Sequence, residues 1–173
     1  MSFLPKLVCC FLLAFSSAVP ARAHTATEWQ QHLKLSNFVN NPLKLPEQPT
    51  LSQLRHFGKV LNVTQRVIPN EYEPLRQNSY YDFHYPGLMI EALYLQTTPN
   101  TGGMIHLIEV SNVRWRLADG IRVGMAENQV RQILGMPNKQ TKRSLEYDGQ
   151  DSSATFWLSH GRVQKVEFDY SIN

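Results

Sequence analysis

Cysteine is nearly absent from this chain of 173 residues. Cys9 and Cys10 both lie within residues 1–23, which have the pattern of a secretory signal: a basic residue, an apolar run over residues 7–15 and a small-x-small cleavage motif at residues 21–23. Cleavage at this motif would leave no thiol in the mature chain. Disulfides, cysteine nucleophiles and thiolate metal ligands would then all be excluded.

A lipid-modified cysteine is also missing from the place where a bacterial lipoprotein carries it. That cysteine would stand at the cleavage point, whereas Cys9 and Cys10 lie well before it. The apolar run is interrupted by serines and a proline, so it is short for a membrane span. We therefore expect a periplasmic protein without a stable membrane anchor, and secretion beyond the envelope stays open.

A block of positive charge is lacking as well. The formal net charge of +3 includes two basic residues of the predicted signal, so the mature chain would carry a net charge of +1. Proteins that bind nucleic acids usually show a basic stripe, and the densest basic cluster here, over residues 139–143, has the composition of a solvated loop. We expect no nucleic-acid partner.

The motifs of common enzyme classes are missing too. The chain has no His-Glu-x-x-His pair, no Gly-x-Ser-x-Gly nucleophile turn and no glycine-rich phosphate loop before a helix. The sequence therefore predicts no catalytic residue, no metal site and no cofactor. One alternative stays open: His84 and His106 could meet across adjacent strands and, with Asp82 or Glu91, form a small hydrolytic or metal-dependent centre.

What the chain does contain is one pattern that occurs twice. Each copy has a short helical segment that ends in a hydrophobic residue and a glycine, then a Tyr-x-Gly turn, then a strand with a glutamate between apolar residues. These landmarks lie at residues 57–58, 85–87 and 108–110 in the first copy, and at residues 134–135, 147–149 and 166–168 in the second. Self-similarity of this kind predicts a tandem architecture.

The predicted fold follows from this pattern. Its parts are the signal over residues 1–23, an N-terminal helix and connector over 24–49, a divergent first α+β repeat over 50–117 and a second repeat over 118–173. Thr50 and Gln53 have the spacing of a capping box at a helix start. We predict an α+β protein of two helix-plus-antiparallel-sheet repeats, with helices on one face of the sheet and an extra N-terminal helix over residues 28–39.

The second copy resembles the SmpA/OmlA family, which includes small outer-membrane assembly lipoproteins. The resemblance rests on the Gly-Ile-x-Val-Gly-Met segment at residues 120–125, the Leu-Gly-x-Pro helix end at residues 134–137, Tyr147, Phe156 and the strand at residues 163–168. It implies the helix-turn-sheet unit of that family, and a fold like that of the β-lactamase inhibitory proteins, which carry the unit twice. In those inhibitors the open face of the sheet holds the partner.

Aromatic and charged residues alternate with apolar ones along the predicted strands. If Phe83 and Phe156 face the helices, then Tyr80, His84 and Trp157 project from the opposite face. Aromatic anchors with a charged rim are typical of protein-binding surfaces. The predicted partner-binding residues are Tyr80, Asp82, His84, Met89, Trp157, Lys165 and Glu167.

Glu109 and Glu167 occupy equivalent positions in the two copies. Two carboxylates support acid/base chemistry only when they lie a few ångströms apart. Equivalent positions in tandem repeats are expected to lie far apart, and strand alternation alone accounts for a polar residue at each position. We therefore interpret the two glutamates as products of strand periodicity.

These expectations converge on an exported, non-enzymatic protein-binding module of the bacterial cell envelope, of the envelope-assembly accessory type. A proteinaceous inhibitor or immunity protein that acts on a periplasmic or extracellular hydrolase is the first alternative. The small enzyme that uses His84 and His106 is the second. The identity of the partner and the oligomeric state stay open.

Overall fold

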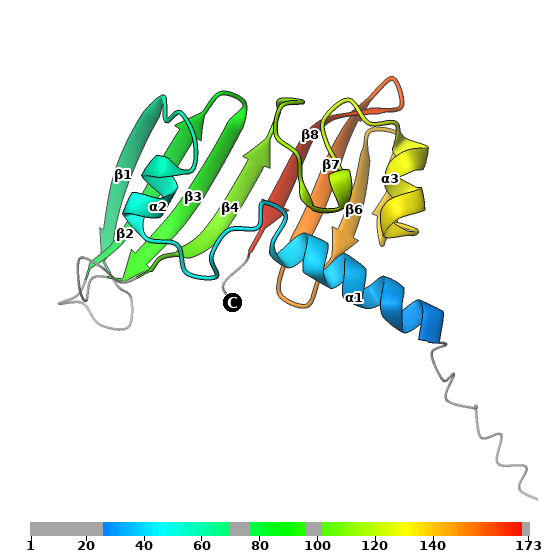
Figure 1. The fold of residues 1–173 in the computed structure, drawn as a ribbon, viewed down its shortest axis with the longest axis horizontal. Coiled ribbons are helices and arrows are strands. Elements are labelled where there is room, and N and C mark those ends of the chain that lie inside the picture. The colour runs from blue at the N-terminus through cyan, green and yellow to red at the C-terminus, as the bar shows by residue number, and fades with distance from the viewer. Residues whose placement is uncertain (1–25, 70–76, 96–101, 171–173) are drawn as a thin grey trace, which may run out of the picture.

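The protein is built on one continuous antiparallel sheet of eight strands (Figure 1). The computed structural model describes residues 26–69, 77–95 and 102–170. The predicted signal and both cysteines lie outside the described residues. Within these ranges, no helix is both long and apolar enough to cross a membrane.

The strands follow the order β1-β2-β3-β4-β8-β7-β6-β5, so two four-stranded meanders meet where β4 pairs with β8. The sheet ends in a strand of eight residues on one side, β1, and in a strand of two residues on the other, β5. The strands are β1 (Asn62–Pro69), β2 (Gln77–Tyr85), β3 (Leu88–Leu95), β4 (Met104–Val110), β5 (Lys139–Gln140), β6 (Ser144–Asp148), β7 (Ser153–Ser159) and β8 (Arg162–Asp169).

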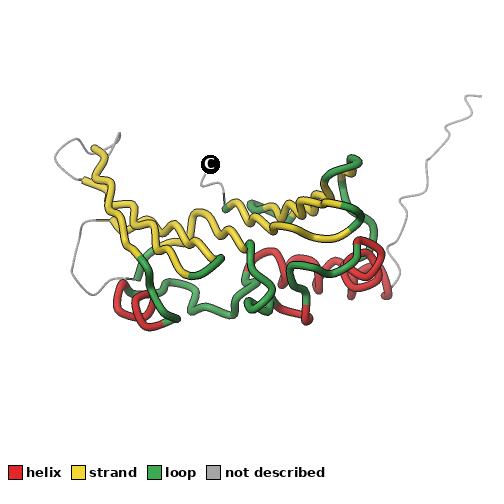
Figure 2. Tube along the Cα trace, turned by 90° about the horizontal axis from the view of Figure 1, so that it is seen from above, coloured by secondary structure: helices red, strands yellow, loops and turns green. Residues whose placement is uncertain are grey.

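The helices lie on one side of the sheet (Figure 2). They are α1 (Ala26–Asn40), α2 (Leu51–His56) and α3 (Glu127–Leu134), with one 3-10 turn, η1 (Ala118–Gly120). In Figure 1, α2 lies over the β1–β4 meander, whereas α1 and α3 lie over the β5–β8 meander. We call the side of the sheet away from these helices the open face.

This architecture overturns the predicted fold of two helix-plus-sheet α+β repeats with an extra N-terminal helix. The described chain is mostly one eight-stranded sheet, and its helices are short, with 15, 6 and 8 residues. The prediction failed because alternation along a segment shows that it is a strand but not which strand it pairs with. Pairing of β4 with β8 joins the final strands of the two supposed repeats into one sheet.

The N-terminal helix is part of the main core rather than an addition to it. Phe38, near the end of α1, is 1% exposed, and its ring centroid lies 6.0 Å from that of Phe156 and 5.5 Å from that of Phe168. The next residue, Val39, is fully buried. The end of α1 therefore fills the space over β7 and β8.

Strand alternation determines which side chains enter the core. In β7, Ala154, Phe156 and Leu158 are buried against the helices, whereas Trp157 is exposed on the open face. In α3, Val130 and the residue four positions later, Leu134, are both buried because that spacing brings them to one side of a helix. The predicted capping box at Thr50 is confirmed: Thr50 and Gln53 bond each other's backbone amides at the start of α2.

Four tyrosine hydroxyls attach the covering segments to the sheet. Each hydroxyl donates to a backbone carbonyl near the end of a helix or, for Tyr94, in the connector before α2. The pairs are Tyr85 with Leu54 (2.5 Å), Tyr94 with Pro49 (2.8 Å), Tyr147 with Gly135 (3.1 Å) and Tyr170 with Val39 (3.0 Å). Burial raises the pKa of Tyr85 to about 12 and that of Tyr147 to about 12.

Candidate protein-binding face

The strand register arranges the side chains of the open face in rows that run across the sheet. One row crosses all eight strands: Asn62, His84, Met89, Glu109, Glu167, Thr155, Glu146 and Lys139. The adjacent row crosses seven strands: Thr64, Asp82, Glu91, Leu107, Asp169, Ser153 and Asp148. We call these two rows the central rows.

The structure places all seven predicted partner-binding residues on the open face. Asp82, His84, Met89 and Glu167 belong to the central rows. Tyr80 lies beside these rows on β2, where it pairs with Arg66 and Leu93, and Trp157 pairs with Lys165 on the other side of the rows. The seven residues do not form one patch, because β3, β4 and β8 lie between Tyr80 and Trp157.

One charged cluster surrounds Arg66 of the edge strand β1. The Arg66 guanidinium bonds the Glu91 carboxylate, lies 3.5 Å from an Asp82 oxygen and sits 5.3 Å from the centre of the Tyr80 ring. His106 completes this cluster. Its Nδ1 lies 2.7 Å from a Glu91 carboxylate oxygen, and its ring packs in a T-shaped arrangement with that of Tyr80, with 5.7 Å between the ring centroids. We call these five residues the Arg66 cluster.

A second charged cluster lies across the junction of the two meanders. Lys165 Nζ donates to Glu109 at 3.0 Å and to Glu167 at 2.9 Å, and it lies 5.6 Å from the centre of the Trp157 ring. Burial acts to lower the pKa of Lys165, but the hydrogen bonds and charges of Glu167 and Glu109 outweigh it and raise the pKa. The ammonium group therefore stays charged. We call these four residues the Lys165 cluster.

The two clusters share one arrangement. In each, a single basic side chain lies between two carboxylates and against an aromatic ring, Tyr80 in one and Trp157 in the other. Charge pairing holds these long side chains in place, while Trp157 remains 42% exposed. The arrangement presents oriented aromatic surface to solvent, which suits binding better than it suits acid/base chemistry, since the carboxylates already face cations.

The sequence interpretation missed four members of these clusters, among them His106, which was considered only in the enzyme alternative. Arg66 was not assigned to a face, although it lies two residues after Thr64 on β1 and therefore on the same face of the sheet. Glu91 was considered only as a partner of the histidines, although a charge inside the apolar run of β3 indicates an outward-facing position. Glu109 was expected to lie far from Glu167, and this was wrong: the two are direct cross-strand partners.

The structure separates the two histidines of the enzyme alternative. His84 is on β2 and His106 is on β4, with β3 between them, so two strand spacings of about 4.8 Å each separate their backbones. His106 contacts Glu91, whereas His84 lies between Asn62 and Met89 in the central row. Among the described residues, no group of three or more histidine, aspartate, glutamate or cysteine side chains is placed to hold a metal ion.

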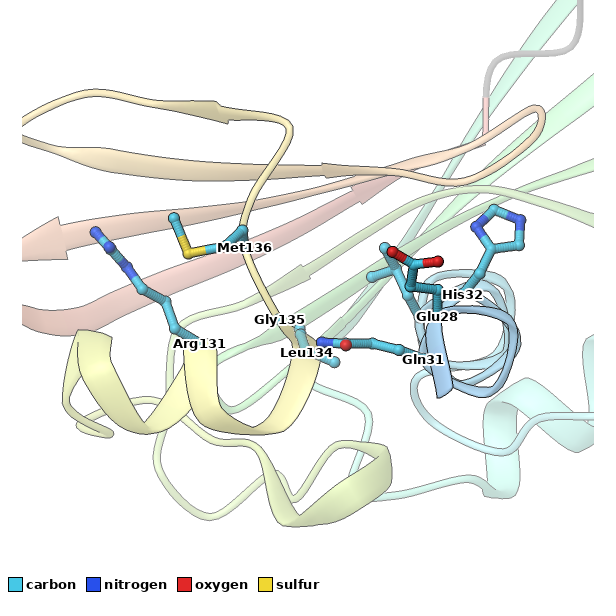
Figure 3. A pocket seen from close by; sticks show the side chains of 8 residues that line it. Glu28, Gln31, His32, Arg131, Leu134, Gly135 and Met136 are labelled. Atoms are coloured by element: carbon cyan, nitrogen blue, oxygen red, sulfur yellow. The ribbon is translucent and has the colours of Figure 1, made fainter. Parts of the chain in front are cut away.

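A cleft on the helix side is a separate feature that the sequence did not predict. It has a volume of about 410 Å³ and lies between α1 and α3 (Figure 3). Glu28, Gln31 and His32 line it from α1, while Arg131 and Met136 line it from the α3 side. Gly135 also lines it, and its φ of +88° is a backbone conformation that favours glycine. The lining residues include an acid, Glu28, and a base, His32, but no serine, threonine, cysteine or lysine that could act as a nucleophile.

Comparison of the chain with protein-family models, with curated proteins and with solved structures finds no match.

Proposed function

We propose that this protein is an exported, non-enzymatic protein-binding module of the bacterial cell envelope, and that its partner binds the open face of the sheet. The observation that carries the proposal is the position of Trp157, which is 42% exposed on a sheet face away from all described helices. Large aromatic side chains held in place by charged neighbours are common binding anchors.

The envelope setting rests on two features of the sequence. The first is the predicted secretory signal over residues 1–23. The second is the resemblance of residues 120–168 to the SmpA/OmlA family, which favours an accessory role in envelope assembly over inhibition of a hydrolase. Both roles use a binding face, so the class of captured partner distinguishes them.

The test is affinity capture from an envelope extract, with the bound proteins identified and quantified by mass spectrometry. Trp157→Ala removes the proposed anchor and is expected to reduce capture of the partner at least about tenfold. Trp29→Ala is the matched control, because Trp29 is also an exposed tryptophan, 57% accessible, but lies on α1 rather than on the sheet. Capture that depends on Trp29 and not on Trp157 would exclude the open face as the binding surface.

A further inference from the structure

Acidic and basic side chains are separated between the open face and the rest of the molecule. The central rows contain seven carboxylates and a single basic residue, Lys139. Across the described residues there are twelve aspartates and glutamates and fourteen lysines and arginines. The open face also holds Arg66, Lys165 and Arg162, the last of which alternates with buried Val163 on β8. The remainder of the described chain therefore carries five carboxylates and ten basic groups.

The basic residues of the open face do not neutralise it. Arg66 and Lys165 each lie between two carboxylates, and Lys139 Nζ lies 3.6 Å from Glu146. Four basic groups, with Arg162 included, against seven carboxylates leave the open face with a formal charge of −3 when its histidines are neutral. The remaining described residues have a formal charge of +5. A nearly neutral protein thus presents one clearly acidic surface.

The open face has the size of a protein interface. Eight strands at a spacing of about 4.8 Å span about 34 Å. The two central rows, with the row of Arg66 and Tyr80 on one side and the row of Trp157 and Lys165 on the other, lie about 7 Å apart and span about 20 Å. Their product, about 700 Å², is close to the area of about 800 Å² that each partner buries in a typical complex. A metal ion or a small cation would use only a small part of this surface.

From this charge separation we infer that the open face binds a lysine- and arginine-rich surface of its protein partner. The inference rests on the proposed function and specifies the chemistry of the partner. Seven carboxylates in two adjacent rows attract basic side chains and repel acidic ones, which selects partners and accelerates their encounter. Trp157 and Tyr80 already lie beside cationic groups at 5.6 and 5.3 Å, and rings of this kind also accept incoming guanidinium or ammonium groups.

The test uses two labelled peptides of equal length and equal aromatic content, one rich in lysine and arginine and the other with glutamate at the same positions. Fluorescence anisotropy gives the dissociation constant of each peptide for the purified protein at ionic strengths of about 0.03 and about 0.15 M. The basic peptide is expected to bind, with an affinity that falls as salt is raised. The acidic peptide is expected not to bind.

Two variants with the same change of total charge separate the open face from general electrostatic attraction. Glu109→Gln with Glu167→Gln removes two charges from the central rows, and we expect at least about fivefold weaker binding of the basic peptide. Glu47→Gln with Asp119→Asn removes two exposed charges elsewhere and should leave the affinity within about twofold. If the first variant does not fold, as judged by its melting curve, Glu146→Gln with Asp148→Asn replaces it in the same rows.

The results distinguish this inference from the proposed function. Equal affinity for both peptides, no binding of the basic peptide, or equal effects of the two double variants would overturn the basic-partner assignment. A partner captured through Trp157 that presents an acidic or neutral surface would also overturn it, while leaving the proposed function in place. If Trp157→Ala captures partners as well as the unchanged protein does, while the central rows still control peptide binding, the proposed function alone is overturned.

Discussion

Glu109 of β4 and Glu167 of β8 are direct cross-strand partners, and the Lys165 ammonium group lies between their carboxylates at 3.0 and 2.9 Å. Like charges directly opposite each other on adjacent strands are destabilising. Since β4 and β8 join the two meanders through only four paired positions, this lysine compensates a repulsion at the junction that connects the two halves of the sheet.

Replacing Lys165 with methionine should lower the free energy of unfolding by about 1 kcal/mol, because Glu109 and Glu167 would then face each other without a cation between them. Urea denaturation at low and high ionic strength measures the effect, which should be larger at low salt. Lys139→Met is the control: Lys139 is 72% exposed and 3.6 Å from Glu146, so its loss should cost less than about 0.5 kcal/mol. Equal losses for the two variants would rule out a special role for the junction.

Truncation of two neighbouring residues of β7 should lower stability by very different amounts. Phe156→Ala is expected to lower the free energy of unfolding by about 3–5 kcal/mol, because it empties a fully buried ring position. Trp157→Ala should cost less than about 1 kcal/mol, since the ring lies on the open face and loses mainly its contact with Lys165. Thermal or chemical denaturation measures both. A loss of several kcal/mol for Trp157→Ala would show that it is a core residue.

The integral position of α1 leads to a third prediction. Phe38→Ala should cost about 3–5 kcal/mol, because the ring packs on Phe156 and Phe168. Leu33→Ala, one and a half turns earlier in the same helix, should cost less than about 1 kcal/mol because Leu33 is 44% exposed. If Phe38→Ala were as mild as Leu33→Ala in denaturant titrations, α1 would be an addition to the sheet after all.

The tyrosine hydroxyls should contribute measurably to stability. Tyr147→Phe leaves the Gly135 carbonyl without this donor, and Tyr85→Phe does the same to Leu54, so each is expected to cost about 1 kcal/mol. Because the two sites lie over different meanders, the losses should add in the double variant. Denaturant titration of the single and double variants tests this. No loss in either single variant would mean that water replaces the hydroxyl.

Alkaline pH should destabilise the protein in a defined window. The pKa values of Tyr85 and Tyr147 are raised to about 12 in the folded chain, against about 10 in an unfolded one, so the folded state retains protons that the unfolded state loses. Their contribution is fully present below about pH 10 and is lost as the pH rises through about 12. Unfolding measured across this range should show a flatter profile for the Tyr85→Phe, Tyr147→Phe double variant; an unchanged slope would contradict this origin.

Local features of this fold were predictable because they depend on neighbours in the sequence. The capping box at Thr50 needs only a partner three residues away, so the local spacing was enough to predict it. Alternation also predicted that Trp157 and His84 lie opposite the buried residues of their strands. These periods of two residues hold as long as no bulge interrupts the strand.

Long-range features could not be predicted in this way. Nothing near Glu109 indicates that its neighbour is Glu167, 58 positions later, and this pairing determines that the sheet is continuous. Two β-bulges could not be predicted from the sequence either. One lies at Glu91 and Ala92, on the strand next to His106, which contacts Tyr80. The other lies at Trp157 and Leu158. Both occur next to the charged clusters, so the least predictable backbone carries the candidate binding residues.

The unequal edges of the sheet limit how copies of this protein could join strand to strand. β1 offers the backbone of eight residues along its outer edge, whereas β5 offers only two. Two copies joined through their β1 edges would leave a two-residue strand at each outer end. Among the described strands, no edge long enough to template a third copy would remain, so association of this kind ends at a dimer and does not continue into a fibre.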